Sequence, residues 1–137
     1  MSGISWKMDV GVNHVPAYQV SGRPFATGSL NATATATAVK VEFPYVTRWI
    51  YVINHDTNVL ACGFSENGLA GTNKFCVHAE GASDKTAPAS VRLELKVSEM
   101  WFTGSANFDV VAGLTSILPD RVSGSIGPSW SGSAGVG

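Results

Sequence analysis

The chain has 137 residues, the size of one domain that can bury a hydrophobic core of its own. Apolar residues make up 45% of it and charged residues only 14%, whereas about 25% charged is usual in soluble domains; this composition excludes intrinsic disorder. Nine basic and ten acidic residues give a formal net charge of −1, which excludes a protein that holds nucleic acid on a basic face. A surface so poor in charge is typical of a protein that packs against others.

No part of the sequence predicts export or insertion into a membrane. Residues 1–11 lack the apolar run that a secretory signal needs. No uncharged apolar stretch approaches the roughly 18 to 20 residues of a membrane span. We therefore expect synthesis in the cytoplasm and no membrane partner.

Alternation of apolar and polar residues recurs along the chain, whereas a helical apolar stripe longer than two turns is absent. Turn-forming residues separate the alternating segments at roughly ten-residue spacing. The sequence therefore predicts an all-β fold, an antiparallel β-sandwich that is jelly-roll-like, with eight or nine short strands. In chain order the expected strands are residues 14–20, 25–30, 39–43, 46–53, 59–64, 73–78, 91–97, 100–103 and 108–117.

Residues 31–38 (NATATATA) are either a low-complexity linker or the start of the strand that continues through residues 39–43. The strand is favoured, because Thr33, Thr35 and Thr37 share parity with the apolar residues that follow and threonine suits a pleated strand. It would be exposed or interfacial, since threonine and alanine bury little surface. Pro44 ends it.

Three later segments lead to specific expectations. Residues 46–53 are apolar at both parities, which predicts a strand covered on both faces. The strands on either side of Asn67-Gly68 predict a hairpin whose turn uses positive φ angles. Residues 91–97 alternate strictly, which predicts a half-buried strand, and the break in phase at Ser98-Glu99 suggests a β-bulge.

The composition divides the chain into an N-terminal arm (residues 1–12), the β-sandwich domain (13–118) and a Gly/Ser-rich C-terminal arm (119–137). Each arm contains one tryptophan, Trp6 and Trp130. Either ring is a stray exposed side chain, or it anchors the arm in a neighbouring subunit, since tryptophan is a common interface anchor.

The sequence lacks the groups that covalent catalysis needs. Its histidines are His14, His55 and His78, and it has no Gly-x-Ser-x-Gly nucleophile turn. It also has no phosphate-binding loop, EF-hand loop or pair of catalytic carboxylates. We expect a protein that is not an enzyme and that binds no cofactor.

The two cysteines allow more than one interpretation. Cys76 and His78 would share a strand face and could supply two metal ligands, with His55 or Cys62 as a third; a small buried cysteine and a surface histidine are favoured instead. If the hairpin turns about Leu69, Cys62 and Cys76 face each other. Two packed thiols are then favoured over a disulfide, because a cytosol is reducing.

Large aromatic side chains are the remaining candidates for a binding site. Trp49 and Tyr51 share a strand face, and with Trp101 and Phe102 they could form a platform on which sugars stack. Ordinary core packing is favoured, since large aromatic residues dominate burial in cores.

Several segments together resemble small β-sandwich virion proteins: the minor capsid, penton or decoration proteins of double-stranded DNA viruses of aquatic hosts, algal viruses or phages. The resemblance covers about residues 15–137 and involves residues 17–22 (AYQVSG), 24–29 (PFATGS), 41–50 (VEFPYVTRWI), 63–68 (GFSENG), 71–73 (GTN), 95–98 (LKVS), 107–115 (NFDVVAGLT) and 129–137 (SWSGSAGVG). It implies a non-enzymatic subunit that oligomerises and docks on a capsid lattice, and it supplies no catalytic residues.

We therefore expect a virion structural protein, made in the host cytoplasm, that assembles with itself as a trimer or pentamer. Its other partners would be the major capsid protein or other virion proteins. Sheet faces and terminal arms would form the contacts, and the candidate interface residues are Trp6, Trp130, Trp101, Thr33, Thr35 and Thr37. The alternative is a carbohydrate-binding β-sandwich module that holds a glycan on exposed aromatic side chains.

Overall fold

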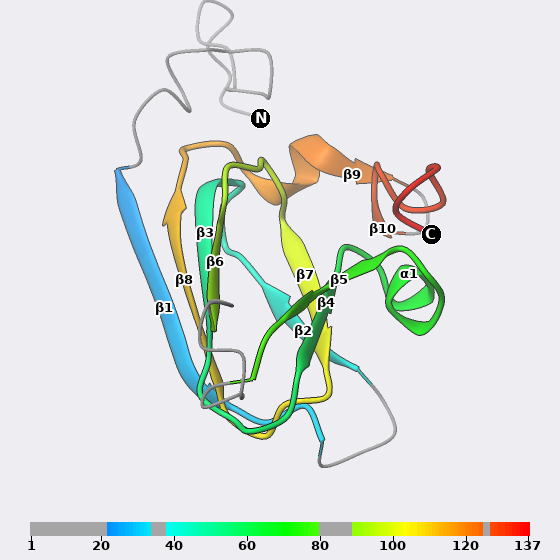
Figure 1. The fold of residues 1–137 in the computed structure, drawn as a ribbon. Coiled ribbons are helices and arrows are strands. Elements are labelled where there is room, and N and C mark those ends of the chain that lie inside the picture. The colour runs from blue at the N-terminus through cyan, green and yellow to red at the C-terminus, as the bar shows by residue number, and fades with distance from the viewer. Residues whose placement is uncertain (1–21, 34–37, 80–88, 125–126) are drawn as a thin grey trace, which may run out of the picture.

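The structure, a computed structural model, describes residues 22–33, 38–79, 89–124 and 127–137. Two four-stranded antiparallel sheets pack face to face (Figure 1), which confirms the predicted all-β sandwich. Sheet I has the order β1 (Arg23–Leu30), β8 (Phe108–Leu114), β3 (Thr47–Asn54), β6 (Ser90–Leu93). Sheet II has the order β2 (Val39–Glu42), β7 (Glu99–Thr103), β4 (Leu60–Gly63), β5 (Lys74–Val77).

The strand pairs are nested in the order of a jelly roll. β1 pairs with β8, β2 with β7, β3 with β6 and β4 with β5, all antiparallel. These four pairs make one long ribbon, which is rolled so that successive pairs alternate between the two sheets. The pairs β3–β8 and β4–β7 complete the sheets. The expected jelly-roll-like sandwich is therefore confirmed, with eight strands in its two sheets.

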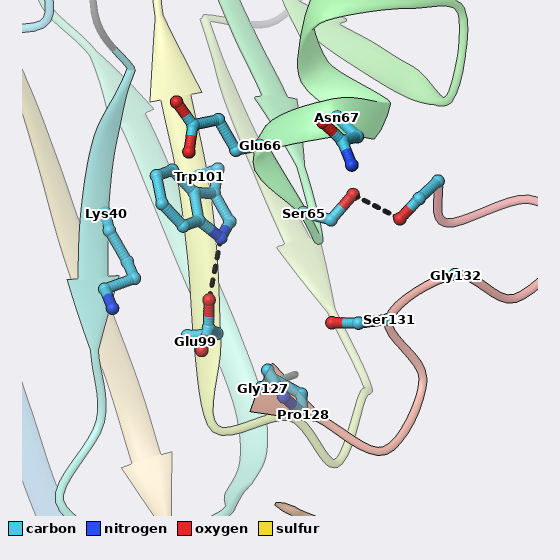
Figure 2. A pocket seen from close by; sticks show the side chains of 11 residues that line it. Lys40, Ser65, Glu66, Asn67, Glu99, Trp101, Gly127, Pro128, Ser131 and Gly132 are labelled. Atoms are coloured by element: carbon cyan, nitrogen blue, oxygen red, sulfur yellow. Dashed lines mark hydrogen bonds between the residues drawn. The ribbon is translucent and has the colours of Figure 1, made fainter. Parts of the chain in front are cut away.

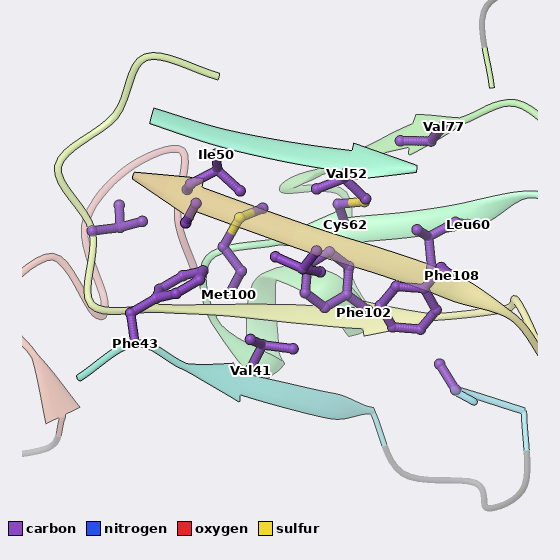
Figure 3. Close-up of a cluster of buried hydrophobic side chains, with 14 of the residues drawn as sticks. Val41, Phe43, Ile50, Val52, Leu60, Cys62, Val77, Met100, Phe102 and Phe108 are labelled. Atoms are coloured by element: carbon purple, nitrogen blue, oxygen red, sulfur yellow. The ribbon is translucent and has the colours of Figure 1, made fainter. Parts of the chain in front are cut away.

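The inward-facing row of each strand forms the core (Figure 3). Phe102 of sheet II lies against Phe108 of sheet I, with ring centroids 4.9 Å apart and ring planes at 41°. The other buried residues of the core are Ala32, Val41, Phe43, Ile50, Val52, Leu60, Cys62, Val77, Val97, Met100, Val110, Ala112 and Leu114.

The prediction of one strand over residues 91–97 is wrong for the second half of this segment. β6 ends at Leu93, and the chain then crosses from sheet I to sheet II, where β7 begins at Glu99. Leu95, which the alternation places on the buried face of the expected strand, is 37% exposed. The break in phase is therefore the crossing between sheets and not a bulge.

A buried threonine holds this crossing in place. The Thr47 hydroxyl donates to the carbonyl oxygen of Leu95 at 2.6 Å and accepts from the Val97 N–H at 3.1 Å. The Thr47 N–H in turn donates to the Val97 carbonyl oxygen at 3.0 Å. These bonds pair the backbone where no strand continues.

The strand expected through residues 31–43 begins only at Val39. Residues 31–33 form a turn in which the Asn31 side-chain oxygen accepts from the N–H and the hydroxyl of Thr33. Ala32 is buried, and its N–H donates to the Ser105 carbonyl oxygen. Thr33 is exposed in this turn. Thr35, Thr37, Trp6 and the strand expected at residues 14–20 lie outside the described residues.

Two local features differ from the prediction: the burial of β3 and the turn between β4 and β5. β3 is fully buried on one face only, because Trp49, Tyr51 and Ile53 on the other face are half-buried and no described element covers them. β4 and β5 do form the predicted hairpin, but the expected turn is a short helix, α1 (Glu66–Ala70). Asn67 and Gly68 lie inside it without positive φ angles.

Asn54, at the end of β3, joins three loops at one end of the sandwich. The side chain is fully buried. Its NH₂ group donates to the carbonyl oxygens of Asn58 at 2.8 Å and His78 at 3.1 Å. Its oxygen accepts from the Ser105 hydroxyl at 2.8 Å and the Asp56 N–H at 3.1 Å. All four hydrogen bonds that an amide side chain can make are formed here.

Replacement of Asn54 by alanine is expected to lower the free energy of unfolding by about 3 kcal/mol, because it leaves several buried polar groups without partners. Urea unfolding measures this loss. The matched control is Asn58→Ala, whose exposed amide donates only to Asp56 and whose carbonyl oxygen is retained. Equal losses in the two variants would contradict the role assigned to Asn54.

Candidate functional site

The described residues after β8 fold against one end of their own sandwich. They form a 3-10 helix, η2 (Pro119–Val122), and a small hairpin of β9 (Ser123–Gly124) and β10 (Gly127–Pro128). Val122 packs with Val46 and Ile117 in a second buried cluster. Trp130 packs against both clusters, and its indole N–H donates to the Phe64 carbonyl oxygen at 3.3 Å. In the structure, the Trp130 ring therefore anchors this segment to its own chain.

The end of this segment lies against α1. Ser65 caps the N-terminus of α1 by accepting from the Gly68 N–H, and its hydroxyl donates to the carbonyl oxygens of Val136 and Gly137, each at 2.8 Å. Gly68 permits this approach, since a Cβ there would lie 1.9 Å from the Val136 oxygen. α1 itself covers Gly63, where a Cβ would touch Leu69 at 3.4 Å.

These contacts enclose a cavity of about 320 Å³ on the outer face of sheet II, which we call the Trp101 cavity (Figure 2). Strands β2 and β7 form its floor, the N-terminal part of α1 one wall, and residues 127–132 with Gly137 the other. Its lining residues are Lys40, Ser65, Glu66, Asn67, Glu99, Trp101, Gly127, Pro128, Ser131, Gly132 and Gly137.

Trp101 stands at the centre of the cavity and is half-buried. Its indole N–H donates to the Glu99 carboxylate at 2.7 Å, which fixes the orientation of the ring. Lys40, opposite Trp101 on β2, places its ammonium nitrogen 5.6 Å from the ring centroid. On the other side, the residue of β4 that pairs with Trp101 is Gly63, so no side chain of that strand crowds the ring.

The charges in the cavity are partly paired. The hydrogen bond to Glu42 is the main cause that raises the pKa of Lys40, and the charges of Glu42 and Glu99 add to it. Lys40 therefore remains positively charged over the whole neutral range. Among the described residues, the side chains of Glu66 and Asn67 have no hydrogen-bond partner, so both are available to a ligand.

The chemistry of the lining residues favours binding over catalysis. They include one lysine and two glutamates but no histidine or cysteine. The Ser–His and Cys–His pairs that acyl transfer commonly uses are therefore not present among them. What they offer is one aromatic face surrounded by hydrogen-bonding groups.

The four aromatic residues of the possible sugar-binding platform lie in three different places in the structure. Phe102 belongs to the core, as favoured for all four residues, but the other three do not. Trp101 lies on the outer face of sheet II, and Trp49 and Tyr51 lie on the outer face of sheet I. The core interpretation is therefore wrong for these three residues, and so is a single platform that would unite them.

Trp49 and Tyr51 belong to a largely apolar surface, which we call the Trp49 face and which comprises Trp49, Tyr51, Ile53, Arg92 and Val111. Trp49, Tyr51, Arg92 and Val111 line a shallow hollow of about 460 Å³. The Arg92 guanidinium carbon lies 5.6 Å from the Trp49 ring centroid, and the Tyr51 hydroxyl lies 3.0 Å from that of Ser90.

His55 and Asp109 lie within hydrogen-bonding distance at the end of sheet I, with 2.8 Å between His55 Nε2 and a carboxylate oxygen. The other carboxylate oxygen accepts from the Ser29 N–H at 2.9 Å, where the chain takes a positive φ of 54° at an irregularity in β1. The Ser29 N–H first, and then His55, hold the pKa of Asp109 below its usual value. The carboxylate thus stabilises the bend in β1.

The two cysteines do not face each other as expected. In the β4–β5 register Cys62 lies opposite Phe75 and Cys76 opposite Ala61, so the two thiols point to opposite faces of sheet II. Both are free; Cys62 is buried and Cys76 is exposed. The prediction that the two thiols pack together is therefore wrong, and so is the prediction that Cys76 is buried. Burial, with a smaller effect of the Cys76 charge, raises the pKa of the Cys62 thiol.

Broader searches give no identification. No protein-family model, no curated protein and no solved structure matches this chain. Within the part of the chain that the structure describes, no group of three His, Cys, Asp or Glu side chains is placed to hold a metal ion. No helix in that same part has the length and apolar character needed to cross a bilayer.

The sequence pattern indicated Trp101 as a candidate binding residue, but it did not indicate the residues that form the walls of its cavity. Ser65, Glu66 and Asn67 were assigned to a hairpin turn, although serine followed by an acidic residue is a signature of a helix start. No local signal marks residues 127–132 as the second wall, since their Gly/Ser composition predicts only flexibility.

The cysteine arrangement predicts a sharp difference in reactivity. In the native protein a thiol reagent such as DTNB is expected to titrate Cys76 alone, because Cys62 is buried and kept protonated. Both thiols should react after unfolding in guanidinium. Cys76→Ser should leave no thiol that reacts in the native state; comparable native reactivity of both cysteines would contradict the register of β4 and β5.

Gly68→Ala is expected to push the end of the chain away from α1, because the new Cβ would collide with a backbone oxygen. The variant should be less stable to heat, although alanine favours helix, and amide hydrogen exchange at residues 127–137 should accelerate. Gly71→Ala, at the other end of α1, is the control, since a Cβ there meets nothing closer than 3.4 Å. Equal exchange in both variants would contradict the packing of this segment.

Proposed function

We propose that this protein is a non-enzymatic structural subunit of a virion, which assembles with copies of itself through the Trp49 face and docks on the capsid as part of that assembly. The observation that supports it most is the partial exposure of Trp49, Tyr51 and Ile53 on an outer sheet face of a chain with only 14% charged residues. Aromatic residues of this kind are enriched in the cores of protein interfaces.

The rim of the Trp49 face favours a second copy of the chain as its partner. Arg48 and Arg92 both pair with Glu94, so positive and negative groups lie side by side along this edge. A patch that has both signs beside an apolar centre can meet another copy with opposite charges in contact. In the expected trimer or pentamer, the Trp49 face of one copy would contact a different patch of the next copy around a closed ring.

Contacts through sheet faces are favoured over contacts through sheet edges. All four edge strands contain charged residues: Arg23 in β1, Lys40 and Glu42 in β2, Lys74 in β5 and Arg92 in β6. Charges on edges discourage the addition of a further strand. The partner copy is therefore placed on the Trp49 face.

The jelly roll adds support of a weaker kind. This architecture is common in viral capsid domains, and also in lectins. A fold alone does not define a function. It is compatible with the resemblance to small virion proteins. The interface roles that remain predictions are those of Trp6, Trp130, Thr33, Thr35 and Thr37.

Self-association is expected to depend on the Trp49 face. Light scattering after size-exclusion chromatography should give the wild-type chain a mass of three or five times 14.3 kDa, and Tyr51→Glu should give the mass of one chain, because it would place a charge at the centre of the interface. Trp101→Ala, on the opposite sheet, is the control and should leave the oligomer unchanged. A wild-type protein that stays monomeric at its highest soluble concentration would refute the proposal.

A further inference from the structure

We infer that the Trp101 cavity binds a neutral saccharide. Three parts of the chain that are far apart in sequence converge there: Trp101 and Glu99 from β7, Glu66 and Asn67 from α1, and Ser131 from the C-terminal segment (Figure 2). The inference does not depend on the proposed assembly, because it concerns the outer face of the other sheet.

The position of Trp101 suits a stacked sugar ring. The apolar C–H face of a pyranose packs on the negative face of an indole ring. Two features keep the ring ready for this contact. The hydrogen bond to Glu99 holds it in one orientation, and the half-burial of Trp101 leaves part of its surface open to the cavity.

Hydrogen-bonding groups surround the ring at the places where sugar hydroxyls would emerge. The Glu66 carboxylate and the Asn67 amide lie on the α1 side, and Figure 2 shows the Ser131 hydroxyl on the opposite wall, directed toward the cavity. The side chains of Glu66 and Asn67 have no hydrogen-bond partner among the described residues. A bound hydroxyl therefore gains hydrogen bonds without breaking any that the folded chain already makes.

The charges favour a neutral ligand. An anionic sugar would meet Glu66 and Glu99, while Lys40, the positive group of the cavity, is already engaged by Glu42. A cation would compete with Lys40 for the Trp101 ring. The volume of about 320 Å³ lies at the lower end of the range for small-molecule sites, which favours a short saccharide unit.

An assembly built through the Trp49 face would leave this site open in every copy. Several weak sites presented together bind a glycan-coated surface far more tightly than one site does. The two faces of the sandwich would then have separate roles, one in contact with protein and the other with carbohydrate.

The experiment is a glycan microarray that displays neutral, sialylated and sulfated glycans, followed by titration calorimetry with the neutral glycan that gives the strongest signal. We expect the full-length chain to bind neutral glycans in preference to sialylated and sulfated ones. Trp101→Ala should lower the affinity at least about tenfold, the loss of one stacking contact. Glu66→Gln, an exposed change that leaves the fold intact, should weaken binding several-fold.

The control is Trp49→Ala, which removes an aromatic ring from the opposite sheet and should leave the affinity for the soluble glycan unchanged. Absence of binding to any neutral glycan, stronger binding to sialylated glycans, or unchanged affinity in both Trp101→Ala and Glu66→Gln would overturn the inference. Tighter binding of choline than of any sugar would also overturn it, because it would make the site a cation site. Failure of self-association alone would leave the saccharide affinity in place, so the two proposals fail separately.

Discussion

The nested antiparallel pairing of the strands is the constraint on which the rest of the structure depends. Once β1 pairs with β8 at one end of the ribbon and β4 with β5 at the other, rolling the ribbon places successive pairs alternately in sheet I and sheet II. Each strand can bury one of its two rows in the shared core, where Phe102 and Phe108 meet. The outer rows of the two sheets are then free to differ.

They differ because the described parts of the chain cover only the outer row of sheet II. On sheet II, α1 and the C-terminal segment stand over the floor, and Gly63 and Gly68 allow both to come close. What remains open is a polar cavity around Trp101. On sheet I, no described element stands over Trp49 and Tyr51, which are as apolar as an interior row. One outer face thus has a cavity lined by polar groups, and the other has a largely apolar surface.

The sequence was sufficient for the fold class and for most strands, since alternation is a local signal. It failed where the cause is not local. The alternation of residues 91–97 continues through the crossing between sheets, so nothing in it marks the end of β6 at Leu93. The two-sided apolar pattern of β3 predicted cover on both faces, but a sequence cannot say whether cover comes from the same chain. Trp101 was found by residue type; its cavity was not, because three distant segments build it.

The central claim is that the outer face of sheet I is covered by another copy of the chain while the outer face of sheet II stays open. Hydroxyl-radical footprinting with mass spectrometry, performed over a dilution series, measures both faces in one experiment. The account predicts that oxidation of Trp49 and Tyr51 falls as the protein concentration rises, while oxidation of Trp101 stays constant. Two results together would contradict it. Oxidation of Trp49 and Tyr51 would not change with concentration, and Trp49 would be oxidised to the same extent in the wild-type protein as in a monomeric Tyr51→Glu variant.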